Sequence, residues 1–323
     1  MTATKEQLRF DGRVVLITGA GRGMGRAHAL LFAARGAKVV VSDVGTDLFG
    51  SGADAGPAEE VVGAIRAAGG EAVPYLADLS TEEGARGAVR ATLNAYGRID
   101  ALVHNAGFTL GGMPFEKESL ARLDKLLSVN TCAAYALCQE AWPAMQQQRH
   151  GRIVIAASTA LYGMAGSVPY STAKASYIGF TRALAAEGAA HGIKVNAVEP
   201  AGATRMAENL AESPFRTWFL DTMKPERVSP LVAVLSHERC PVNGEFFIVG
   251  GGRVARTLLG ETHGWVDADQ SPEDALEHLP EVMADARRYF PNAGDSVLKY
   301  SALVLGYDMD DSAVAAKPAT GSK

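Results

Sequence analysis

Short apolar runs alternate with longer amphipathic segments from about residue 12 to residue 249. The apolar runs are rich in β-branched residues and predict strands: VVLIT (14–18), KVVVSD (38–43), ALVHN (101–105), RIVIAAS (152–158), IKVNAV (193–198) and EFFIVG (245–250). Because these runs lack polar alternation, we expect them to be buried on both faces, as in a parallel sheet. Alanine-rich segments between them, such as 25–35, 57–68 and 81–96, predict helices. The pattern therefore predicts an α/β protein with a doubly wound parallel sheet.

Two segments depart from this alternation. Residues 45–56, GTDLFGSGADAG, form a long Gly- and Asp-rich loop after the second predicted strand. Beyond residue 250 the alternation stops, and one helix is expected at about 272–288. We expect residues 1–250 to form the main domain, residues 251–311 to be a C-terminal extension packed on it, and residues 312–323 to be a disordered tail.

Composition narrows the functional classes. The 323 residues are 47% hydrophobic, enough for a substantial core, and the net charge of -5 argues against nonspecific binding to nucleic acid. Cys132, Cys138 and Cys240 form no CxxC pair, so neither a metal site nor a disulfide framework is indicated. The N-terminus lacks a signal-peptide core, and no apolar run approaches the roughly 20 residues of a membrane span. We therefore expect a cytoplasmic protein that binds neither nucleic acid nor membrane.

A glycine-rich turn follows the first predicted strand, in the segment TGAGRGMGRAHAL. Gly19, Gly23 and Gly25 stand between this strand and a helix N-terminus, with Arg22 and Met24 among them. Glycines let the backbone approach a pyrophosphate, and a helix N-terminus favours its negative charge. The turn therefore predicts a dinucleotide site on a Rossmann-type fold. A glycine-rich turn that binds no ligand is the alternative.

Asp43 ends the second predicted strand, 18 residues after Gly25. A carboxylate there can bind the adenosine ribose hydroxyls and repels a 2′-phosphate, which favours NAD over NADP. Arg22 favours NADP instead, because an arginine in the glycine turn can contact a phosphate. We give Asp43 more weight, since its charge would lie closer to the 2′ position. Alternatively, Asp43 is only a turn residue before Gly45.

Two further short segments carry candidate cofactor contacts. Asp78, which precedes Leu79, can bond the adenine amine or can cap the helix expected from residue 81. The next predicted strand ends in small residues that suit a backbone lying against the cofactor, although an ordinary turn would use them too: Asn105, Ala106 and Gly107.

Residues 157–174, ASTALYGMAGSVPYSTAK, combine three groups suited to proton transfer. Tyr170 and Lys174 stand at i and i+4, on one face of a helix. A tyrosine has an ordinary pKa of about 10, and a nearby ammonium lowers it. The positive nicotinamide ring of an oxidised cofactor would act in the same direction. A hydroxyl from Ser158 can hold a substrate oxygen beside Tyr170, so the stretch predicts a general acid/base.

At this point the chain resembles the short-chain dehydrogenase/reductase superfamily. The matching motifs span about residues 13–202: TGAGRGMG, the acidic end of the second strand, DLS, NAG, SVN, the strand-terminal serine and YSTAK. The resemblance implies that Tyr170 is the general acid/base and that Lys174 lowers its pKa and holds the nicotinamide ribose. It implies that Ser158 orients the substrate oxygen and that Asn130 supports a water linking Lys174 to solvent. It also implies cofactor contacts by Met24, Leu79, Pro200, Gly202 and Thr204, and a homodimer or homotetramer built on helices within 109–147 and 172–188.

The chain departs from the family pattern at two places. The family usually has NNAG where this chain has HNAG, and we expect His104 to pack or bond locally rather than to act in catalysis. The serine usually precedes the tyrosine by thirteen positions, whereas Ser158 precedes Tyr170 by twelve. This spacing implies a one-residue deletion in the intervening loop, and Thr159 is the alternative hydroxyl.

A narrower resemblance is to the (3R)-hydroxyacyl-CoA dehydrogenase unit of type 2 multifunctional enzymes of β-oxidation. It rests on the segments FDGRVVLITGAGRGMGRAHALLFAARGAKVVVSDVG, AEEVVGAIRAAGGEAV and PAGATRM, and on the stretch from MKPERVSP to GETHGW. In the superfamily, the region 203–224 is a lid over the substrate; here it carries Met206, Leu210, Phe215, Trp218, Phe219 and Leu220. These residues suit an acyl chain or a steroid, or they pack in the core or a subunit interface. Arg253 and Arg256 can meet an acyl-CoA phosphate or be ordinary surface arginines.

The expected activity is NAD-dependent interconversion of a secondary alcohol and a ketone, without a metal, in lipid metabolism. The expected substrate is a 3-hydroxyacyl-CoA or a related apolar hydroxy compound. The alternatives are a dehydrogenase of a hydroxysteroid, terpene or cyclic alcohol and, from another class, a catalytically silent nucleotide-binding scaffold.

Overall fold

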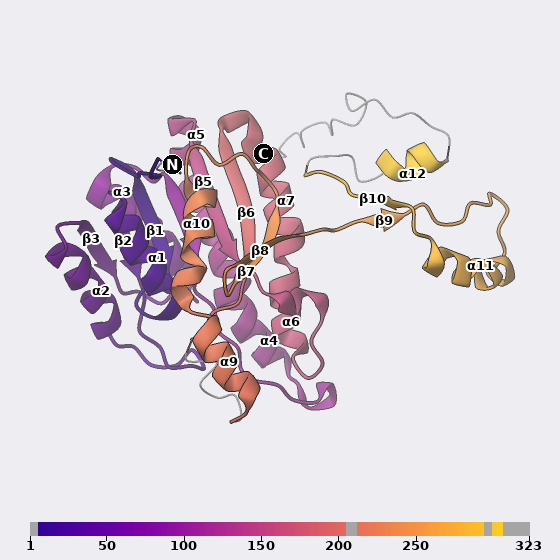
Figure 1. Ribbon diagram of the computed structural model, residues 1–323, viewed down its shortest axis with the longest axis horizontal. Coiled ribbons are helices and arrows are strands. Elements are labelled where there is room, and N and C mark those ends of the chain that lie inside the picture. Colours follow the sequence, from indigo (N-terminus) through magenta and orange to yellow (C-terminus); the bar gives the residue numbers. More distant parts are fainter. Residues whose placement is uncertain (1–5, 205–211, 294–298, 306–323) are drawn as a thin grey trace, which may run out of the picture. The chain divides into compact units, whose positions relative to one another are not determined.

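A computed structural model of the chain describes residues 6–204, 212–293 and 299–305 (Figure 1). The chain divides into two compact units, Met1–Arg256 and Thr257–Lys323. The first unit contains the doubly wound α/β architecture that the sequence predicted.

The central sheet has eight strands in the order β3-β2-β1-β4-β5-β6-β7-β8. Their bounds are β1 Val14–Thr18, β2 Lys38–Ser42, β3 Glu71–Tyr75, β4 Ala101–His104, β5 Gly151–Ala156, β6 Ile193–Pro200, β7 Phe246–Gly250 and β8 Arg253–Thr257. Strands β1 to β7 pair in parallel, so the predicted parallel sheet is confirmed. The order reverses between β1 and β4, and ligands of open α/β sheets bind at such a switch point.

The two strands that the sequence pattern missed lie at the edges of the sheet. Of the side chains of β3 only Ala72 is buried, and the strand contains the exposed Pro74, so it shows no continuous apolar run. Strand β8 follows β7 after a two-residue turn in which Gly251 has φ 58° and Gly252 has φ 88°. Such a turn is the geometry of a tight hairpin. The sheet therefore continues past residue 250 to Thr257.

Helices cover both faces of the sheet. The α-helices of the first unit are α1 Gly23–Ala34, α2 Gly56–Ala67, α3 Glu82–Tyr96, α4 Leu120–Leu127, α5 Ala133–Gln148, α6 Val168–Ala175, α7 Tyr177–Gly188, α9 Pro214–Thr222 and α10 Ser229–Ser236. Shorter turns are the 3₁₀ helices Phe115–Lys117, Thr159–Tyr162, Ala189–His191 and Pro225–Arg227 and the π-helical turn Ser128–Cys132. Helices α1, α2 and α10 pack together on one face, and α3, α5 and α7 lie on the other (Figure 1).

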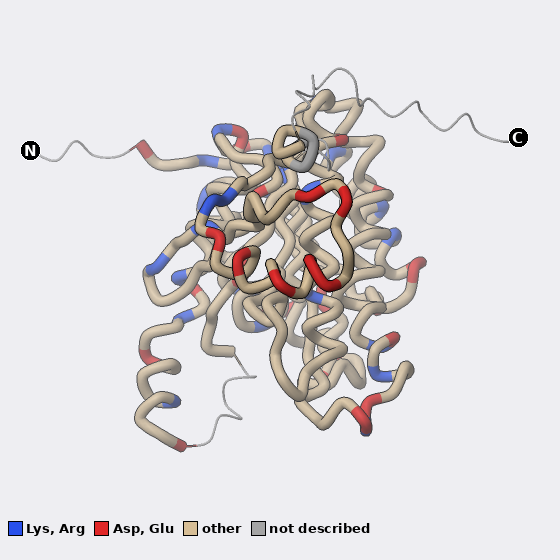
Figure 2. The backbone as a smooth tube through the Cα atoms, turned by 90° about the vertical axis from the view of Figure 1, so that its right-hand side faces the viewer, with Lys and Arg blue, Asp and Glu red and all other residues tan. Residues whose placement is uncertain are grey.

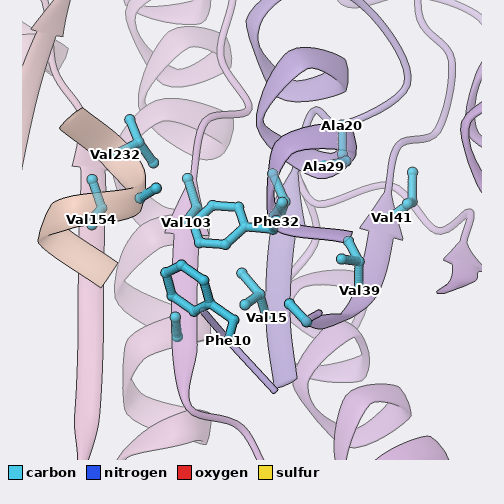
Figure 3. Packing of buried hydrophobic residues seen from close by; sticks show 14 of the residues in the cluster. Phe10, Val15, Ala20, Ala29, Phe32, Val39, Val41, Val103, Val154 and Val232 are labelled. Atoms are coloured by element: carbon cyan, nitrogen blue, oxygen red, sulfur yellow. The ribbon is translucent and has the colours of Figure 1, made fainter. Parts of the chain in front are cut away.

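The core between α1, α10 and the sheet is built from small and branched residues around two aromatic rings (Figure 3). The ring of Phe10 meets the ring of Phe32 on α1 edge to face, with centroids 4.9 Å apart. Val15 and Val103 pack beside these rings from neighbouring strands β1 and β4. This interior is fully buried, so it holds the carboxyl ends of the strands, where the site lies, in a fixed arrangement.

The second unit contains the two-stranded sheet of β9 Glu261–Thr262 and β10 Arg288–Tyr289, and the helices α11 Pro272–Ala284 and α12 Lys299–Val304. A capping box between Ser271 and Asp274 starts α11, so the helix expected at 272–288 is confirmed. It ends at Ala284 because Arg288 belongs to β10. Helix α11 carries four acidic residues and no Lys or Arg (Figure 2).

The unit boundary falls after Arg256, later than the boundary predicted at residue 250, because β8 joins the central sheet. None of the side chains described between residues 258 and 293 is buried. The packing of this extension on the main domain stays a prediction, and the expected tail 312–323 lies outside the described residues. Among the described residues, no helix has the length and apolar character needed to cross a membrane.

Candidate active site

A cavity of about 320 Å³ opens at the carboxyl ends of the strands of the first unit. Its lining includes most of the residues that the sequence singled out: Gly19, Arg22, Gly23, Met24, Asp43, Asp78, Leu79, Asn105, Ala106, Gly107, Ser158, Tyr170, Lys174, Pro200 and Thr204. Gly25, Asn130 and Gly202 are not part of the lining but lie against residues that are: Gly19, Gly107 and Met24. The tertiary structure thus brings the predicted cofactor and catalytic residues to one place.

The glycine turn leaves a cradle that side chains would fill. Gly19 has φ 62°, and a Cβ atom there would lie 2.9 Å from the Cα atom of Ala106. A Cβ atom on Gly25 would overlap the carbonyl oxygen of Gly19. Helix α1 begins at Gly23, and the N-cap residue Arg22 makes no side-chain hydrogen bond to it. An uncapped helix N-terminus behind a bare backbone suits a pyrophosphate.

Asp43 makes the contacts of a turn residue and also lines the cavity, while its contact with the adenosine ribose stays a prediction. Its Oδ2 accepts a hydrogen bond from the backbone N–H of Gly21 at 2.8 Å, which ties it to the glycine turn. Its Oδ1 accepts from the N–H of Gly45 at 2.7 Å, as a turn residue would. Since Asp43 also lines the cavity, its negative charge acts on whatever binds there.

Asp78 does not cap the following helix. Its carboxylate accepts hydrogen bonds from the N–H and the hydroxyl of Ser80, both at 2.8 Å. Thr81 is the N-cap of α3 instead, where its hydroxyl accepts from the N–H of Gly84. The capping alternative is therefore wrong for Asp78, and the adenine contact stays a prediction.

Hydrogen bonds of Asn105 link the end of β4 to the end of β1. Its side-chain amide donates to the carbonyl oxygens of Thr18 and Gly19, at 3.2 Å and 3.1 Å. The hydroxyl of Thr18 accepts from the N–H groups of Asn105 and Ala106. These bonds hold the NAG segment against the glycine turn, where its small residues line the cavity.

The three catalytic candidates converge at the other side of the cavity. Tyr170 and Lys174 project from α6, whose N-terminal turn contains Pro169, and Ser158 follows β5 as the N-cap of the turn Thr159–Tyr162. The hydroxyl of Ser158 hydrogen-bonds with that of Tyr170. The buried Nζ of Lys174 donates to the carbonyl oxygen of Ala156 at 2.8 Å and lies 5.7 Å from the centroid of the Tyr170 ring. Thr159 is exposed and does not line the cavity, so the geometry favours Ser158.

Burial disfavours the charged forms of both Tyr170 and Lys174. Burial raises the pKa of Tyr170, and the hydrogen bond with Ser158 lowers it by less. Burial also lowers the pKa of Lys174 from 10.5 to about 7, so near neutral pH the side chain is only partly charged. Both groups lie in an environment that disfavours charge, and the lowering of the pKa of Tyr170 by Lys174 stays a prediction.

Asn130 lies in the π-helical turn Ser128–Cys132 and is completely buried. Its side-chain nitrogen donates to the carbonyl oxygens of Leu126 at 2.9 Å and Phe108 at 3.3 Å. Its Oδ1 has no hydrogen-bond partner within the described chain. A Cβ atom on Gly107 would lie 2.5 Å from this oxygen and 3.4 Å from Nζ of Lys174. The arrangement leaves a buried acceptor near Nζ of Lys174.

The model of the short chain dehydrogenase family matches residues 13–214, which include all of these groups. The chain belongs to the short-chain dehydrogenase/reductase family. It is thus an oxidoreductase by family, as the motifs implied.

Several characterised or solved proteins are similar to this dehydrogenase. A Mycobacterium tuberculosis protein named as a short-chain type dehydrogenase/reductase is 38% identical over 272 residues, which cover 84% of this chain and 93% of that protein. The mouse (Mus musculus) peroxisomal multifunctional enzyme type 2 is 40% identical over 258 residues, 80% of this chain. The match spans only 34% of that enzyme's length. The crystal structure of a short chain dehydrogenase from Mycobacterium avium, 36% identical, has a TM-score of 0.74 and covers 88% of this chain and 99% of its own.

His104, the departure from NNAG, bonds locally in this dehydrogenase. Its Nδ1 lies 3.1 Å from the hydroxyl of Thr18. This hydroxyl already accepts two backbone N–H groups, so it donates its own proton to Nδ1. Burial, together with the charge of Lys174, lowers the pKa of His104 to about 3. The ring is therefore neutral at physiological pH and supports the end of β4.

The motifs did not point to several residues of the cavity. Phe108 and Lys125 line it beside the NAG segment, with Nζ of Lys125 5.8 Å from the centroid of the Phe108 ring. The loop 45–56 contributes Thr46, Asp47, Leu48 and Gly50. A Cβ atom on Gly50 would lie 2.8 Å from the ring of Phe108, so the loop reaches across to the segment after β4. In the sequence, only the length and glycine content of this loop set it apart, and they did not indicate that it lines the cavity.

The expected lid is partly described. Helix α9 has no buried side chain, and Phe215 and Trp218 are 57% and 49% exposed. The ring of Phe215 contacts those of Trp218 and Phe219, with centroids 5.8 Å and 5.9 Å apart. These rings do not pack in the core, so that alternative is wrong for them, and a lid over the substrate or a subunit interface stays a prediction. Met206 and Leu210 lie outside the described residues.

Proposed function

We propose that this protein is an NAD-dependent dehydrogenase that interconverts a secondary alcohol and a ketone, with a 3-hydroxyacyl-CoA or a related apolar hydroxy compound as substrate. The observation that carries the proposal is the convergence of Ser158, Tyr170 and Lys174 in the cavity that the glycine turn also lines. Neither group of residues alone would support it. Glycine turns bind nucleotides in many kinds of protein, and a Tyr/Lys pair at this spacing occurs by chance in helices.

The residues present fit a nicotinamide dinucleotide. The bare backbone at Gly19 and the N-terminus of α1 suit the pyrophosphate, and Asp43 suits the adenosine ribose. The unpaired Oδ1 of Asn130 and the ammonium of Lys174 provide buried polar atoms at the nicotinamide side. When bound, the oxidised cofactor supplies the hydride acceptor and a positive ring. The carboxylate of Asp43 is the reason for proposing NAD rather than NADP.

The chain's own residues position the substrate and move its proton. The hydroxyls of Ser158 and Tyr170 hold the substrate oxygen between them, and Tyr170 takes the proton during oxidation or returns it during reduction. Because burial raises the pKa of Tyr170, the phenolate is scarce until positive charge is added beside it. Lys174, whose pKa of about 7 lets it exchange a proton near neutrality, would pass that proton to a water bound at Oδ1 of Asn130 and from there to solvent. Among the described residues, no cluster of His, Cys, Asp or Glu side chains is suited to a metal ion.

The substrate class is supported by two features. The exposed rings of α9 offer an apolar surface for an acyl chain or a steroid. The similarity to a peroxisomal multifunctional enzyme type 2 favours the acyl-CoA among these. Arg256 does not add to the case, because its guanidinium is bound in a bidentate ion pair with Glu245, at 2.7 Å for both contacts. The homo-oligomer implied by the family stays a prediction.

Tyr170→Phe tests the catalytic assignment. The variant keeps the ring but loses the hydroxyl that exchanges the substrate proton, so turnover should fall by at least about 10²-fold, the usual worth of a general acid/base. The affinity for NAD should change little. The measurement is NADH formation at 340 nm with (3R)-hydroxyacyl-CoAs, hydroxysteroids and small cyclic alcohols, run with NAD and NADP in parallel.

Thr159→Val provides the matched control, because it removes the neighbouring exposed hydroxyl and should leave turnover unchanged. Near-normal activity of Tyr170→Phe would show that another group moves the proton. No turnover by the wild-type chain with any alcohol, despite tight NAD binding, would favour the catalytically silent scaffold.

A further inference from the structure

The guanidinium of Arg22 is already bound within this chain. Its Nη1 donates to the carbonyl oxygen of Thr46 at 3.2 Å, and its Nη2 lies 3.3 Å from Oδ2 of Asp54. Arg22 is the N-cap residue of α1 and lines the cofactor cavity, whereas both partners belong to the loop 45–56. The cation of the glycine turn is therefore paired with a loop that begins two residues after Asp43.

The position of Asp54 is fixed by its own backbone contacts. Its N–H donates to the carbonyl oxygen of Val44 at 2.9 Å, and its Oδ1 accepts from the N–H of Gly56 at 3.0 Å. Gly45 has φ 77°, and a Cβ atom there would overlap the carbonyl group of Asp54. Asp54 thus closes the neck of the loop beside the end of β2, and its second carboxylate oxygen faces Arg22.

The carboxylate of Asp43 is hydrogen-bonded to Gly21, the residue before Arg22. It lines the cavity with Asp47, Asp78 and the cations Arg22, Lys125 and Lys174. Asp54 adds a further carboxylate directly on the guanidinium. A 2′-phosphate brings about two more negative charges into this field, so it meets repulsion and an arginine that is already engaged.

We propose that Asp54 is a specificity-determining residue, which pairs with Arg22 and withholds its guanidinium from the 2′-phosphate of NADP. The inference rests on the proposed function and divides the preference for NAD between two carboxylates. Asp43 acts through its own charge, and its oxygens are bound to the N–H groups of Gly21 and Gly45. Asp54 acts through Arg22.

Asp54→Asn tests this role by direct binding. The amide keeps an oxygen for the N–H of Gly56 but loses the charge opposite Arg22, so the neck of the loop is preserved. Titration calorimetry with NAD and NADP should show a Kd for NADP that falls about fivefold, the scale of a partly exposed ion pair, and a Kd for NAD within about twofold of the wild type. The gain in affinity for NADP should shrink at 0.5 M KCl, because salt screens the contact between arginine and phosphate.

Two further variants show whether a lower Kd for NADP comes from freeing Arg22 or from the loss of any exposed carboxylate. Arg22→Ala combined with Asp54→Asn should abolish the gain for NADP, because the freed guanidinium is what binds the phosphate. Asp11→Asn removes another exposed ion pair, that with Arg9, before the start of β1, and should change neither Kd. The thermal midpoint of every variant confirms that the fold is retained.

The outcomes distinguish this inference from the proposed function. If wild-type protein prefers NAD and Asp54→Asn leaves the ratio of the two Kd values unchanged, the role of Asp54 is wrong and the dehydrogenase proposal stands. A gain that persists without Arg22 overturns the role as well. If the wild type binds neither nucleotide, or prefers NADP, both the NAD assignment and the role of Asp54 fall.

Discussion

Lys174 combines two properties that oppose each other in a folded protein. It is fully enclosed, and its ammonium donates to the single carbonyl oxygen of Ala156. Burial lowers its pKa from 10.5 to about 7, so the folded chain releases a proton that the unfolded chain would hold up to about pH 10. A buried lysine that costs stability in this way, in a cavity beside Tyr170, is a candidate for a functional role.

Lys174→Met should reveal this cost as a function of pH. Because the unfolded chain binds the proton more tightly, the free energy of unfolding of the wild type gains a contribution that rises between about pH 7 and pH 10.5. Below pH 7 the penalty is complete. Relative to the wild type, the variant should therefore be stabilised at pH 6, and that advantage should decline by roughly 3–5 kcal/mol toward pH 10. Urea unfolding at both pH values measures it.

Lys224→Met is the matched control, since the side chain of Lys224 is half exposed and near α9 in sequence. This substitution removes an exposed ammonium and should change the free energy of unfolding little. A pH-independent difference between Lys174→Met and the wild type would mean that Lys174 stays fully charged in the fold.

At the scale of elements, the site depends on backbones that approach closely. The segment after β4 lies against the π-helical turn Ser128–Cys132, and the contact is made possible by the missing side chain of Gly107. A π-helical turn interrupts the regular helix and is often found at functional sites. Here it places Asn130 beneath Gly107, between the carbonyl oxygens of Leu126 and Phe108.

Gly107→Ala should separate these two elements. The added methyl group would lie 2.5 Å from Oδ1 of Asn130, so either the turn or the strand end must shift. Overpacking of this kind costs about 1–3 kcal/mol, and NAD binding should weaken as the lining moves. Differential scanning calorimetry and NAD titration measure the two effects.

Gly63→Ala offers a control within the same unit. Gly63 lies on the exposed side of α2, and a Cβ atom there would meet nothing within 4 Å. Alanine should stabilise the helix by about 0.5–1 kcal/mol without changing NAD affinity. If both alanine variants behaved alike, the contact between Gly107 and Asn130 would not constrain the site.

At the scale of the whole molecule, the cofactor cavity belongs to the first unit alone. Every residue of its lining lies between Gly19 and Thr204, and the central sheet ends at Thr257. The second unit differs in kind, because its described side chains from 258 to 293 include none that is buried, although Leu276 and Met283 are large and apolar. The side chains described in this unit thus form no buried core that would account for its stability.

A chain that stops after Thr257 should therefore keep the fold of the first unit. We expect one cooperative unfolding transition and an NAD affinity close to that of the full chain, measured by circular dichroism and calorimetry. The separate peptide 257–323 should show the circular dichroism of an unfolded chain. Loss of NAD binding on truncation would place part of the nucleotide site in the second unit.

The sequence by itself determined the strands that carry the site and most of its residues. Short apolar runs rich in β-branched residues, such as VVLIT, favour buried strands. The glycine turn and the pair of Tyr170 and Lys174 are local patterns with a fixed spacing. The edge strands β3 and β8 escaped this reasoning, because partly exposed strands show no such run. The sequence predicted helix α11 but not its end at Ala284, before β10. Strand β10 forms only by pairing with β9, a distant segment.

Only the tertiary structure decided how the charged and polar groups of the site behave. The pKa values of Tyr170 and Lys174 move in the directions set by burial. Burial depends on the packing of α6 against α4, the turn Thr159–Tyr162 and the π-helical turn. The pairing of Arg22 with Asp54 joins residues 32 positions apart through the closure of a loop. A local pattern fixes which side chains are present, whereas solvent exclusion and long-range contacts, which fix their charge, arise only when the segments pack together.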